Sequence, residues 1–309
     1  MKPLQGKVAV VAGGTRGAGR GIAMMLGEAG ATVYVTGRST KGNLSSMGRT
    51  ETIEETAELV TKQGGKGIAV RVDHTVKDGV EALFVKIEQE QNGQLDILVN
   101  DVWGGDPLTE WNVPFWEHNL DNGIQMQTTA VHSHIITSHY GVPLMVKNKK
   151  GLIVEITDGV DYEYRGNLFY SLAKISTIHL AQAMARDLAP HNITSIAVSP
   201  GFLRSEAMLD IFGVTEENWQ EGAKKDPHFI ASETPFFIGR AIAALASDPN
   251  VHRKTGKALS SWELAREYKF KDIDGRQPDW GKYFEEHVVE NGENSDMEII
   301  ETKLDKQEE

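Results

Sequence analysis

The fold is decided near the N-terminus, by the stretch Val8-Ala9-Val10-Val11-Ala12-Gly13-Gly14-Thr15-Arg16-Gly17-Ala18-Gly19-Arg20-Gly21. Its first four residues are apolar and predict a buried strand, and the residues after Gly17 have helical spacing. Glycines between a strand and a helix permit a tight turn and a close approach of backbone N–H groups to a phosphate. We therefore predict a phosphate-binding turn, the alternative being glycines that only let the sheet turn a sharp corner.

Short apolar runs alternate with longer segments of helical spacing over the first 250 residues. The runs that predict strands are Val8–Val11, Thr32–Thr36, Gly67–Val72, Leu95–Asn100, Leu152–Thr157 and Ile193–Val198. The segments that predict helices are Gly17–Gly30, Glu51–Gly64, Lys77–Asn92, about Asp121–Lys147 and Asn167–Ala189. Continuous apolar runs are typical of parallel strands buried on both faces, and crossovers of this length join parallel strands. The sequence therefore predicts an α/β protein with a Rossmann-type, doubly wound parallel sheet.

The chain has 309 residues, which we interpret as a single domain over residues 1–265 with an acidic C-terminal extension over residues 266–309. Residues 202–235 interrupt the alternation, and so long an insertion after a strand is expected to lie where ligands bind. We interpret this segment as a substrate lid. The sequence from residue 281 onward contains ten acidic and three basic residues, a composition typical of a solvated tail. Its few apolar residues leave open that the tail docks on this chain or on a neighbouring subunit.

Composition excludes several classes of function. The net charge of −12 argues against binding to nucleic acid or to an anionic membrane surface. The absence of cysteine excludes disulfide scaffolds, thiol catalysis and zinc–thiolate sites. No apolar run reaches the length of about 18 residues that a membrane span needs. We expect a cytoplasmic protein. We also expect no metal site, because His132, His134 and His139 do not share one helix face.

Several motifs resemble the short-chain dehydrogenase/reductase family. The spacing of Gly13, Gly17 and Gly19 is similar to its T-G-x-x-x-G-x-G motif, with alanine replacing the threonine. The other matching segments are Asp73, Leu95–Asn100, Tyr170-Ser171-Leu172-Ala173-Lys174 and Pro200-Gly201-Phe202-Leu203-Arg204-Ser205. Together they cover residues 5–260. The stretch from residue 255 to 276 also resembles the subgroup around dehydrogenase/reductase SDR family member 1.

The resemblance implies a nicotinamide dinucleotide cofactor. The residues that it places at the cofactor are Gly13, Thr15, Arg16, Gly17, Ala18, Gly19, Arg38, Asp73, Asn100, Tyr170, Lys174, Pro200, Gly201, Leu203 and Ser205. An enzyme that uses NAD needs a carboxylate near the end of the second strand, but no Asp or Glu lies between Glu28 and Glu51. Arg38 follows that strand instead, and Arg16 lies in the glycine turn. Two guanidinium groups can bind a 2′-phosphate, which favours NADP(H) over NAD(H).

The resemblance also implies catalytic roles for Tyr170 and Lys174, which lie four apart on one helix face. Tyr170 would donate a proton to a substrate carbonyl, with its pKa lowered by the ammonium of Lys174. The family has a serine thirteen residues before the tyrosine, and that count falls on Thr157, whose hydroxyl could bind the developing oxyanion. Alternatively, Thr157 is only a strand residue. The family's helix asparagine falls on Ala130 here, which leaves three alternatives: a proton relay through water, a slow enzyme, or loss of catalysis.

We interpret the chain as an NADP(H)-dependent oxidoreductase that interconverts a small-molecule carbonyl and alcohol. The resemblance implies a homodimer or homotetramer, formed through residues 121–147 and 167–189. One rival is a non-catalytic nucleotide-binding regulator or scaffold with the same fold. Another is an enoyl reductase, which would need a tyrosine where Asn167 lies. A sugar epimerase would need a glycine where Arg20 lies.

Overall fold

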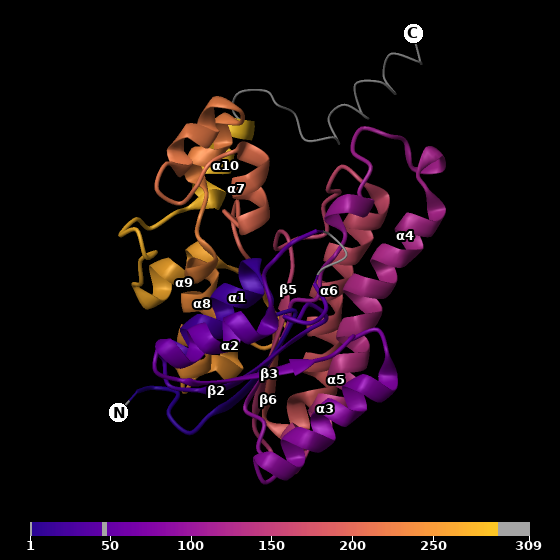
Figure 1. Cartoon of the computed structure of the whole chain (residues 1–309), viewed down its shortest axis with the longest axis vertical. Coiled ribbons are helices and arrows are strands. Elements are labelled where there is room, and N and C mark those ends of the chain that lie inside the picture. The colour runs from indigo at the N-terminus through magenta and orange to yellow at the C-terminus, as the bar shows by residue number, and fades with distance from the viewer. Residues whose placement is uncertain (1, 45–47, 290–309) are drawn as a thin grey trace.

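The computed structural model describes residues 2–44 and 48–289, and in that part of the chain seven parallel strands form one sheet (Figure 1). The strand order β3-β2-β1-β4-β5-β6-β7 reverses its direction between β1 and β4. This order confirms the predicted Rossmann-type, doubly wound sheet. The strands are β1 Val8–Ala12, β2 Thr32–Gly37, β3 Lys66–Arg71, β4 Ile97–Asn100, β5 Gly151–Ile156, β6 Ile193–Ser199 and β7 Ala258–Ser260.

Each predicted strand is present, with its ends within two residues of the prediction. The short strand β7 was not predicted, because three residues carry too little periodicity to be recognised. It forms through parallel pairing with β6, in which Ala197 lies opposite Ala258 and Ser199 opposite Ser260. The pairing places residues 258–260, shortly before the C-terminal extension, at the edge of the sheet.

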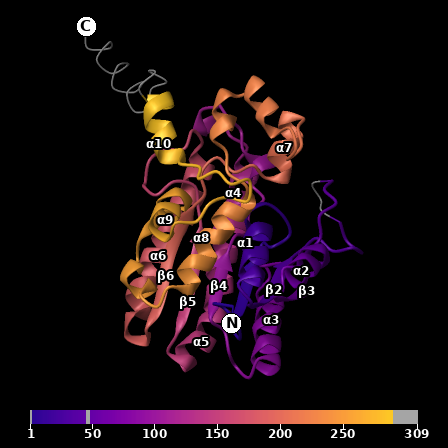
Figure 2. The same cartoon turned by 90° about the vertical axis from the view of Figure 1, so that its left-hand side faces the viewer.

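Helices cover both faces of the sheet. One face is covered by α1 Gly17–Glu28, α2 Ile53–Lys62, α8 Pro235–Ser247 and α9 Ser261–Tyr268 (Figure 2). The other is covered by α3 Lys77–Glu90, α5 Ser133–Asn148 and α6 Leu168–Leu188. Helices α1 and α8 cross at Gly21 and Gly239, where a side chain on either glycine would clash with the other helix. No helix among the described residues is both long and apolar enough to span a membrane.

The long helix predicted over residues 121–147 is interrupted near its centre. Helix α4 Leu120–Gln127 continues through one π-helical turn, Thr128–His132, into α5. The hydroxyls of Thr128 and Ser133 donate to carbonyls four residues earlier, a contact that bends helices. Single π-helical turns are often found at functional sites. Ala130 is buried in this turn.

The interpreted lid, residues 202–235, folds around a core of its own. It contains α7 Glu206–Phe212 and two 3-10 turns, and the rings of Phe212, Trp219 and Phe229 pack together inside it. Glu206 contacts Gly17, which follows β1, so the segment lies over the carboxyl end of that strand. Ligands bind at this end of an open α/β sheet.

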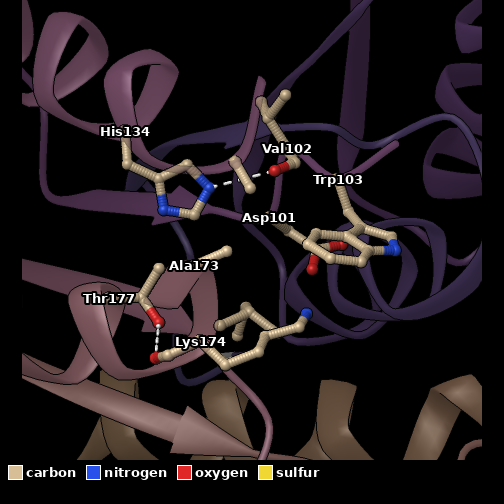
Figure 3. A pocket seen from close by; sticks show the side chains of 9 residues that line it. Asp101, Val102, Trp103, His134, Ala173, Lys174 and Thr177 are labelled. Carbon is tan, nitrogen blue, oxygen red and sulfur yellow. Dashed lines mark hydrogen bonds between the residues drawn. The ribbon is translucent and has the colours of Figure 1, made fainter. Parts of the chain in front are cut away.

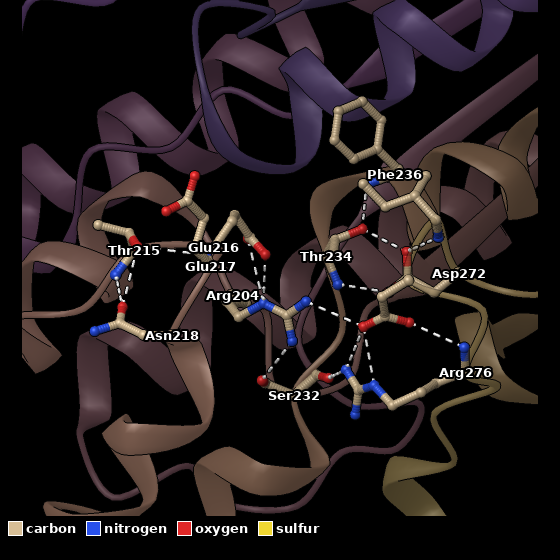
Figure 4. Close-up of polar contacts among 12 residues, drawn as sticks. Arg204, Thr215, Glu216, Glu217, Asn218, Ser232, Thr234, Phe236, Asp272 and Arg276 are labelled. Carbon is tan, nitrogen blue, oxygen red and sulfur yellow. Dashed lines mark hydrogen bonds and ion pairs between the residues drawn. The ribbon is translucent and has the colours of Figure 1, made fainter.

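The described part of the C-terminal extension packs against that segment rather than standing apart from it. The Thr234 N–H donates to Asp272 at 2.8 Å, and the buried guanidinium of Arg204 contacts Glu216 at 3.0 Å and Asp274 at 3.3 Å (Figure 4). The ring of Trp280, in α10 Trp280–Phe284, lies 5.6 Å from that of Phe202. Residues 266–289 are therefore a structural support of the interpreted lid, and the remainder of the acidic tail lies outside the described residues.

Candidate active site

The glycine turn after β1 is shaped by contacts that leave no room for side chains. A side chain on Gly13 would clash with the Asp101 backbone, and one on Gly19 would clash with the Gly13 carbonyl. Gly13 also has a φ of 89° and Gly17 a φ of 55°, a left-handed conformation that glycine adopts without strain. The backbone N–H groups of Gly13 and Gly14 both donate to the Thr36 carbonyl on β2. The turn therefore holds the start of α1 against the sheet.

The N-terminus of α1 binds an anionic group of the protein itself. The Gly17 N–H donates to the carboxylate of Glu206 at 2.8 Å, and Arg20 Nε lies 3.7 Å from the same carboxylate. Free N–H groups and the helix dipole favour a negative charge at this position. The observed contact shows that this turn accepts an oxyanion, so the residues present fit the pyrophosphate of a dinucleotide. Glu206 was not predicted as a site residue, because it comes directly after the Pro200–Ser205 motif and belongs to no motif itself.

The two arginines expected at the 2′-phosphate each lie near a carboxylate. Arg38 Nη1 is 3.9 Å from Asp73, and about half of its side chain is exposed (52%). Arg16 Nη1 is 3.6 Å from Glu51, which also binds Arg49 at 2.6 Å. Arg38 directly follows β2, and Asp73 follows the neighbouring strand β3. Arg49, which was not predicted, adds a third guanidinium to this region.

The other predicted cofactor residues occupy two places. Thr15 and Ala18 are buried within the glycine turn and the first turn of α1. Pro200, Gly201, Leu203 and Ser205 follow β6. There the Gly201 N–H donates to the buried carboxyl of Glu233 at 3.0 Å, and the Ser205 hydroxyl caps α7. Burial raises the pKa of Glu233 to about 8, so burial favours the protonated form of this carboxyl.

The side chain of Asn100 does not lie at the surface where a cofactor would be contacted. It is buried and donates to Glu155 at 2.7 Å and to Ser138 at 2.9 Å. Glu155 also binds His134 at 2.6 Å, so β4, β5 and α5 share one buried polar network. This carboxylate partner of His134 could not be recognised from the sequence, because Glu155 lies 21 residues away on β5. In the structure, the Asn100 side chain is therefore part of a buried hydrogen-bond network that joins β4, β5 and α5.

The hydroxyl of Tyr170 donates to the carboxylate of Asp158 at 2.8 Å. Asn167 caps the start of α6 by accepting the Tyr170 N–H, which orients the first turn of the helix. The Tyr170 ring centroid lies 5.4 Å from that of Trp103 and 5.3 Å from that of Trp111. Burial and the charge of Asp158 hold the pKa of Tyr170 well above its usual value. This differs from the expected lowering by Lys174, because a carboxylate rather than an ammonium is the hydroxyl's neighbour.

Lys174 points toward Trp103 and Asp101, one helical turn beyond Tyr170 (Figure 3). Its Nζ lies 3.9 Å from the Trp103 ring centroid and 5.5 Å from that of Tyr170. Burial lowers the pKa of Lys174, although the charges of Asp158, Asp101 and Asp106 oppose that effect. Burial also raises the pKa of Asp101 to about 7. The Lys174 ammonium and the Asp101 carboxyl thus lie near each other, close to Tyr170.

The hydroxyl of Thr157 makes a contact within the fold, which differs from the oxyanion role expected of it. Its hydroxyl donates to the Lys174 carbonyl at 2.8 Å and its N–H to the Val198 carbonyl, so it fastens β5 to α6 and β6. The next residue, Asp158, contacts the tyrosine instead. A count along the chain assumes a fixed loop length, whereas the loop between β5 and α6 determines which residue reaches Tyr170. The oxyanion role therefore has no support at Thr157.

A cavity of about 10 Å³ is lined in part by Lys174 and is at the lower limit of the space that one water molecule needs. Its lining includes Asp101 and His134 (Figure 3). Ala130 lines it as well. The substitution that was expected to change a proton relay thus lies beside the lysine. No group of three or more metal-ligating side chains gathers in residues 2–44 and 48–289.

Comparisons with known proteins agree with this geometry. The sequence model of the short chain dehydrogenase family matches residues 7–212. Dehydrogenase/reductase SDR family member 1 of Mus musculus is 36% identical over 280 residues, which cover 89% of this chain and 86% of the relative. The Homo sapiens protein of the same name is 34% identical over 278 residues, covering 89% and 85%. The resemblance to this subgroup is therefore confirmed.

A solved structure supports the same assignment. 7α-Hydroxysteroid dehydrogenase, in complex with NADH and 7-oxo glycochenodeoxycholic acid, superposes with a TM-score of 0.67 at 25% identity. The match covers 89% of this chain and 96% of that one. The glycine turn, the Tyr170–Lys174 pair and these similarities lead to one conclusion. The chain belongs to the short-chain dehydrogenase/reductase family, whose oxidoreductases bind a nicotinamide cofactor.

Proposed function

We propose that this protein is an NADP(H)-dependent oxidoreductase that interconverts a carbonyl and an alcohol, with Tyr170 as the group that exchanges a proton with the substrate oxygen. The observation that carries the proposal is the 2.8 Å hydrogen bond between the Tyr170 hydroxyl and the Asp158 carboxylate. A phenol that is bonded to a proton acceptor, beside a buried lysine, can transfer its proton without first reaching solvent. Family membership supports the redox part of the reaction.

The glycine turn at Gly13–Gly19 would hold the pyrophosphate of the dinucleotide, and Lys174 would hold the ribose beside the nicotinamide. When bound, this cofactor supplies or accepts a hydride. Arg38 and Arg16 favour NADP(H), because a guanidinium can form paired hydrogen bonds with a 2′-phosphate. The carboxylates of Asp73 and Glu51, which now lie near these arginines, would then face the phosphate as well. The preference is therefore a balance between two sets of charges.

Aromatic side chains favour an apolar substrate. Trp103 and Trp111 flank the Tyr170 ring, and Trp111 is about half exposed (52%). The charges of Asp158, Asp101 and Asp106 act on the ammonium of Lys174. A negatively charged carbonyl compound would be repelled by this set of carboxylates. A neutral small molecule with an apolar body fits the site better.

We also propose that the chain forms a homodimer or homotetramer. Ile124 of α4, Ile135 of α5 and Leu172 of α6 are exposed apolar residues on the helices that were expected to form the interface. Burying such residues against a second copy would remove apolar surface from water. Light scattering of the purified chain at micromolar concentrations would show a multiple of the monomer mass; a monomer mass throughout would reject the proposal.

One experiment tests the catalytic proposal against its rival. The purified protein is supplied with NADPH or NADH and a panel of aliphatic, aromatic and steroid ketones, and with the oxidised cofactors and the matching alcohols. We expect turnover of at least one neutral apolar pair, faster with NADPH. The rival, a nucleotide-binding regulator, is favoured by Ala130, which lies where the family has its helix asparagine. Tight NADPH binding without turnover of any compound would support that rival.

A further inference from the structure

The Tyr170 hydroxyl has a proton acceptor that none of the family motifs in the sequence contains. Its O–H donates to Asp158 Oδ2 at 2.8 Å, across the gap between the end of β5 and the first turn of α6. The Asp158 backbone is held in turn by Arg165, whose Nε donates to the Asp158 carbonyl at 3.2 Å. Both Tyr170 and Asp158 are half-buried. The carboxylate is thus positioned to receive the phenolic proton.

We propose, on the basis of the function proposed above, that Asp158 accepts the phenolic proton of Tyr170 during alcohol oxidation and returns it during carbonyl reduction. Asp158 acts through Tyr170 and does not need to contact the substrate. The role differs from that of a hydroxyl at Thr157, which would stabilise an oxyanion by donating a hydrogen bond but could not take up a proton at neutral pH. The protein then has a tyrosine–carboxylate pair as its acid–base device.

The transfer balances in protons and electrons. During oxidation the alcohol O–H bond breaks and its proton moves to the Tyr170 oxygen, while the phenolic proton moves to Asp158 Oδ2. The alcohol C–H bond breaks with both electrons, which leave as a hydride for the oxidised nicotinamide cofactor. The alcohol is oxidised to a carbonyl, the cofactor is reduced, and Asp158 ends as a neutral carboxylic acid. Asp158 then loses its proton to solvent before the next turnover.

The charges around Tyr170 and Asp158 explain why the Tyr170 hydroxyl needs an acceptor for its own proton. From the β4 side, Asp101 and Asp106 act on this region, and from α6 the ammonium of Lys174 does so. Arg165 and Asp158 belong to the loop before α6. Burial and the nearby carboxylates raise the pKa of Tyr170, so a resting phenolate is unfavourable. The tyrosine can act as a base only if its own proton leaves as the substrate proton arrives.

A titration without substrate or cofactor provides the first test. Tyrosinate absorbance is followed with pH in the wild type and in Asp158→Asn, and the contribution of Tyr170 is obtained by subtracting the curve of Tyr170→Phe. Removing the negative charge and the acceptor should lower the pKa of Tyr170 by about one unit or more. Asp158→Glu should stay near the wild type. An unchanged pKa in Asp158→Asn would overturn the proposal.

The matched control is Asp161→Asn, the same substitution in the same loop. Asp161 binds Arg165 at 2.6 Å and does not contact Tyr170, so the pKa of Tyr170 should not move. An equal shift in both variants would mean that the loop has rearranged, and the proposal would lose its support. Thermal unfolding of each variant shows whether it is folded. If Asp158→Asn does not fold, Asp158→Glu and Asp158→Ser replace it, and the pKa should fall only in the serine variant.

The pH profile of alcohol oxidation provides the second test, with the best substrate pair from the panel. Asp158→Asn should lose at least tenfold in kcat at pH 7 and recover as the pH rises, because hydroxide can then remove the phenolic proton. Asp158→Glu should keep a profile close to the wild type. A kcat within threefold of the wild type in Asp158→Asn, with no change in pH profile, would reject the role of Asp158.

Tyr170→Phe separates failure of this proposal from failure of the proposed function. If Tyr170→Phe is inactive and Asp158→Asn is fully active, Tyr170 exchanges its proton elsewhere and only the role of Asp158 is wrong. If Tyr170→Phe itself remains active, the acid–base role of Tyr170 in the proposed function is wrong, and the role of Asp158 is wrong with it, whatever the titration shows.

Discussion

The Glu206 carboxylate accepts a hydrogen bond from the Gly17 N–H at 2.8 Å, across 189 residues of sequence. Glu206 belongs to α7 of the interpreted lid, and Gly17 begins α1. A carboxylate thus occupies the backbone donor that a dinucleotide pyrophosphate would be expected to use. An ion pair between Arg49 and Asp210, at 2.8 Å, holds the same helix to the segment after β2. Cofactor binding and the position of α7 should therefore be coupled.

Replacing Glu206 by glutamine should strengthen NADPH binding. The substitution removes a competing charge and the repulsion between that charge and the pyrophosphate. A charge-assisted hydrogen bond contributes about 1.5–3 kcal/mol, so we expect a gain in affinity of about tenfold. Isothermal titration of both proteins measures it. Asp210→Asn is the control, because it loosens α7 without changing the glycine turn and should have a smaller effect. Weaker NADPH binding in Glu206→Gln would contradict this coupling.

Replacing Tyr170 by phenylalanine should abolish turnover and leave NADPH affinity nearly intact. The variant lacks the hydroxyl that exchanges the proton but retains Lys174 and the glycine turn. We expect kcat to fall by more than tenfold, a loss above about 1.4 kcal/mol of transition-state stabilisation. Steady-state kinetics and NADPH titration on one preparation test both parts. Residual kcat above about a tenth of the wild type would show that Tyr170 is not the acid–base group.

Replacing Arg38 by alanine should weaken NADPH binding by roughly ten- to a hundredfold and leave NADH binding almost unchanged. Only NADPH carries the 2′-phosphate, and the half-exposed Arg38 is the guanidinium that directly follows β2. Arg38→Asp should shift the preference toward NADH. Lys41→Ala is the control, since Lys41 pairs with Glu58 in α2. Equal losses for both cofactors would show that Arg38 is structural.

Glu233 should make the protein less stable as pH rises. Burial raises the pKa of its carboxyl from 4.5 to about 8, so folding favours the protonated form. The stabilisation is fully present below pH 4.5 and is lost as the pH rises through about 8. The free energy of unfolding should fall in this window by up to roughly 1.4 kcal/mol per pH unit.

Urea unfolding at pH 5, 6, 7, 8 and 9 measures this slope, with Glu233→Gln as the comparison. The amide has nearly the same shape and can still accept from the Gly201 N–H and the Ser261 hydroxyl. It carries no titrating proton, so the variant should show a shallower fall in stability across the same pH range. Parallel curves for the two proteins would show that Glu233 is already ionised in the folded chain.

The family motifs of the site could be recognised in the sequence, because the residues of each motif lie close together along the chain. The strand before Gly13, the turn and the start of α1 are consecutive, and Tyr170 and Lys174 share a helix face at a spacing of four. Hydrophobic periodicity and turn chemistry depend on neighbours along the chain, so the sheet, its parallel strands and these motifs could be predicted from the sequence alone. The three-residue strand β7 was too short for this, and only pairing with β6 made it a strand.

The groups around those motifs were decided by tertiary structure. Thirteen residues counted back from Tyr170 led to Thr157, but the path of the intervening loop brought Asp158 to the hydroxyl. Glu206 reached Gly17 because α7 folds back over the end of β1. Such contacts depend on loop lengths and on packing between distant segments, which no local pattern encodes. The sequence thus determined the sheet and the tyrosine–lysine pair, whereas tertiary packing decided which charges face that pair and which anion the turn now holds.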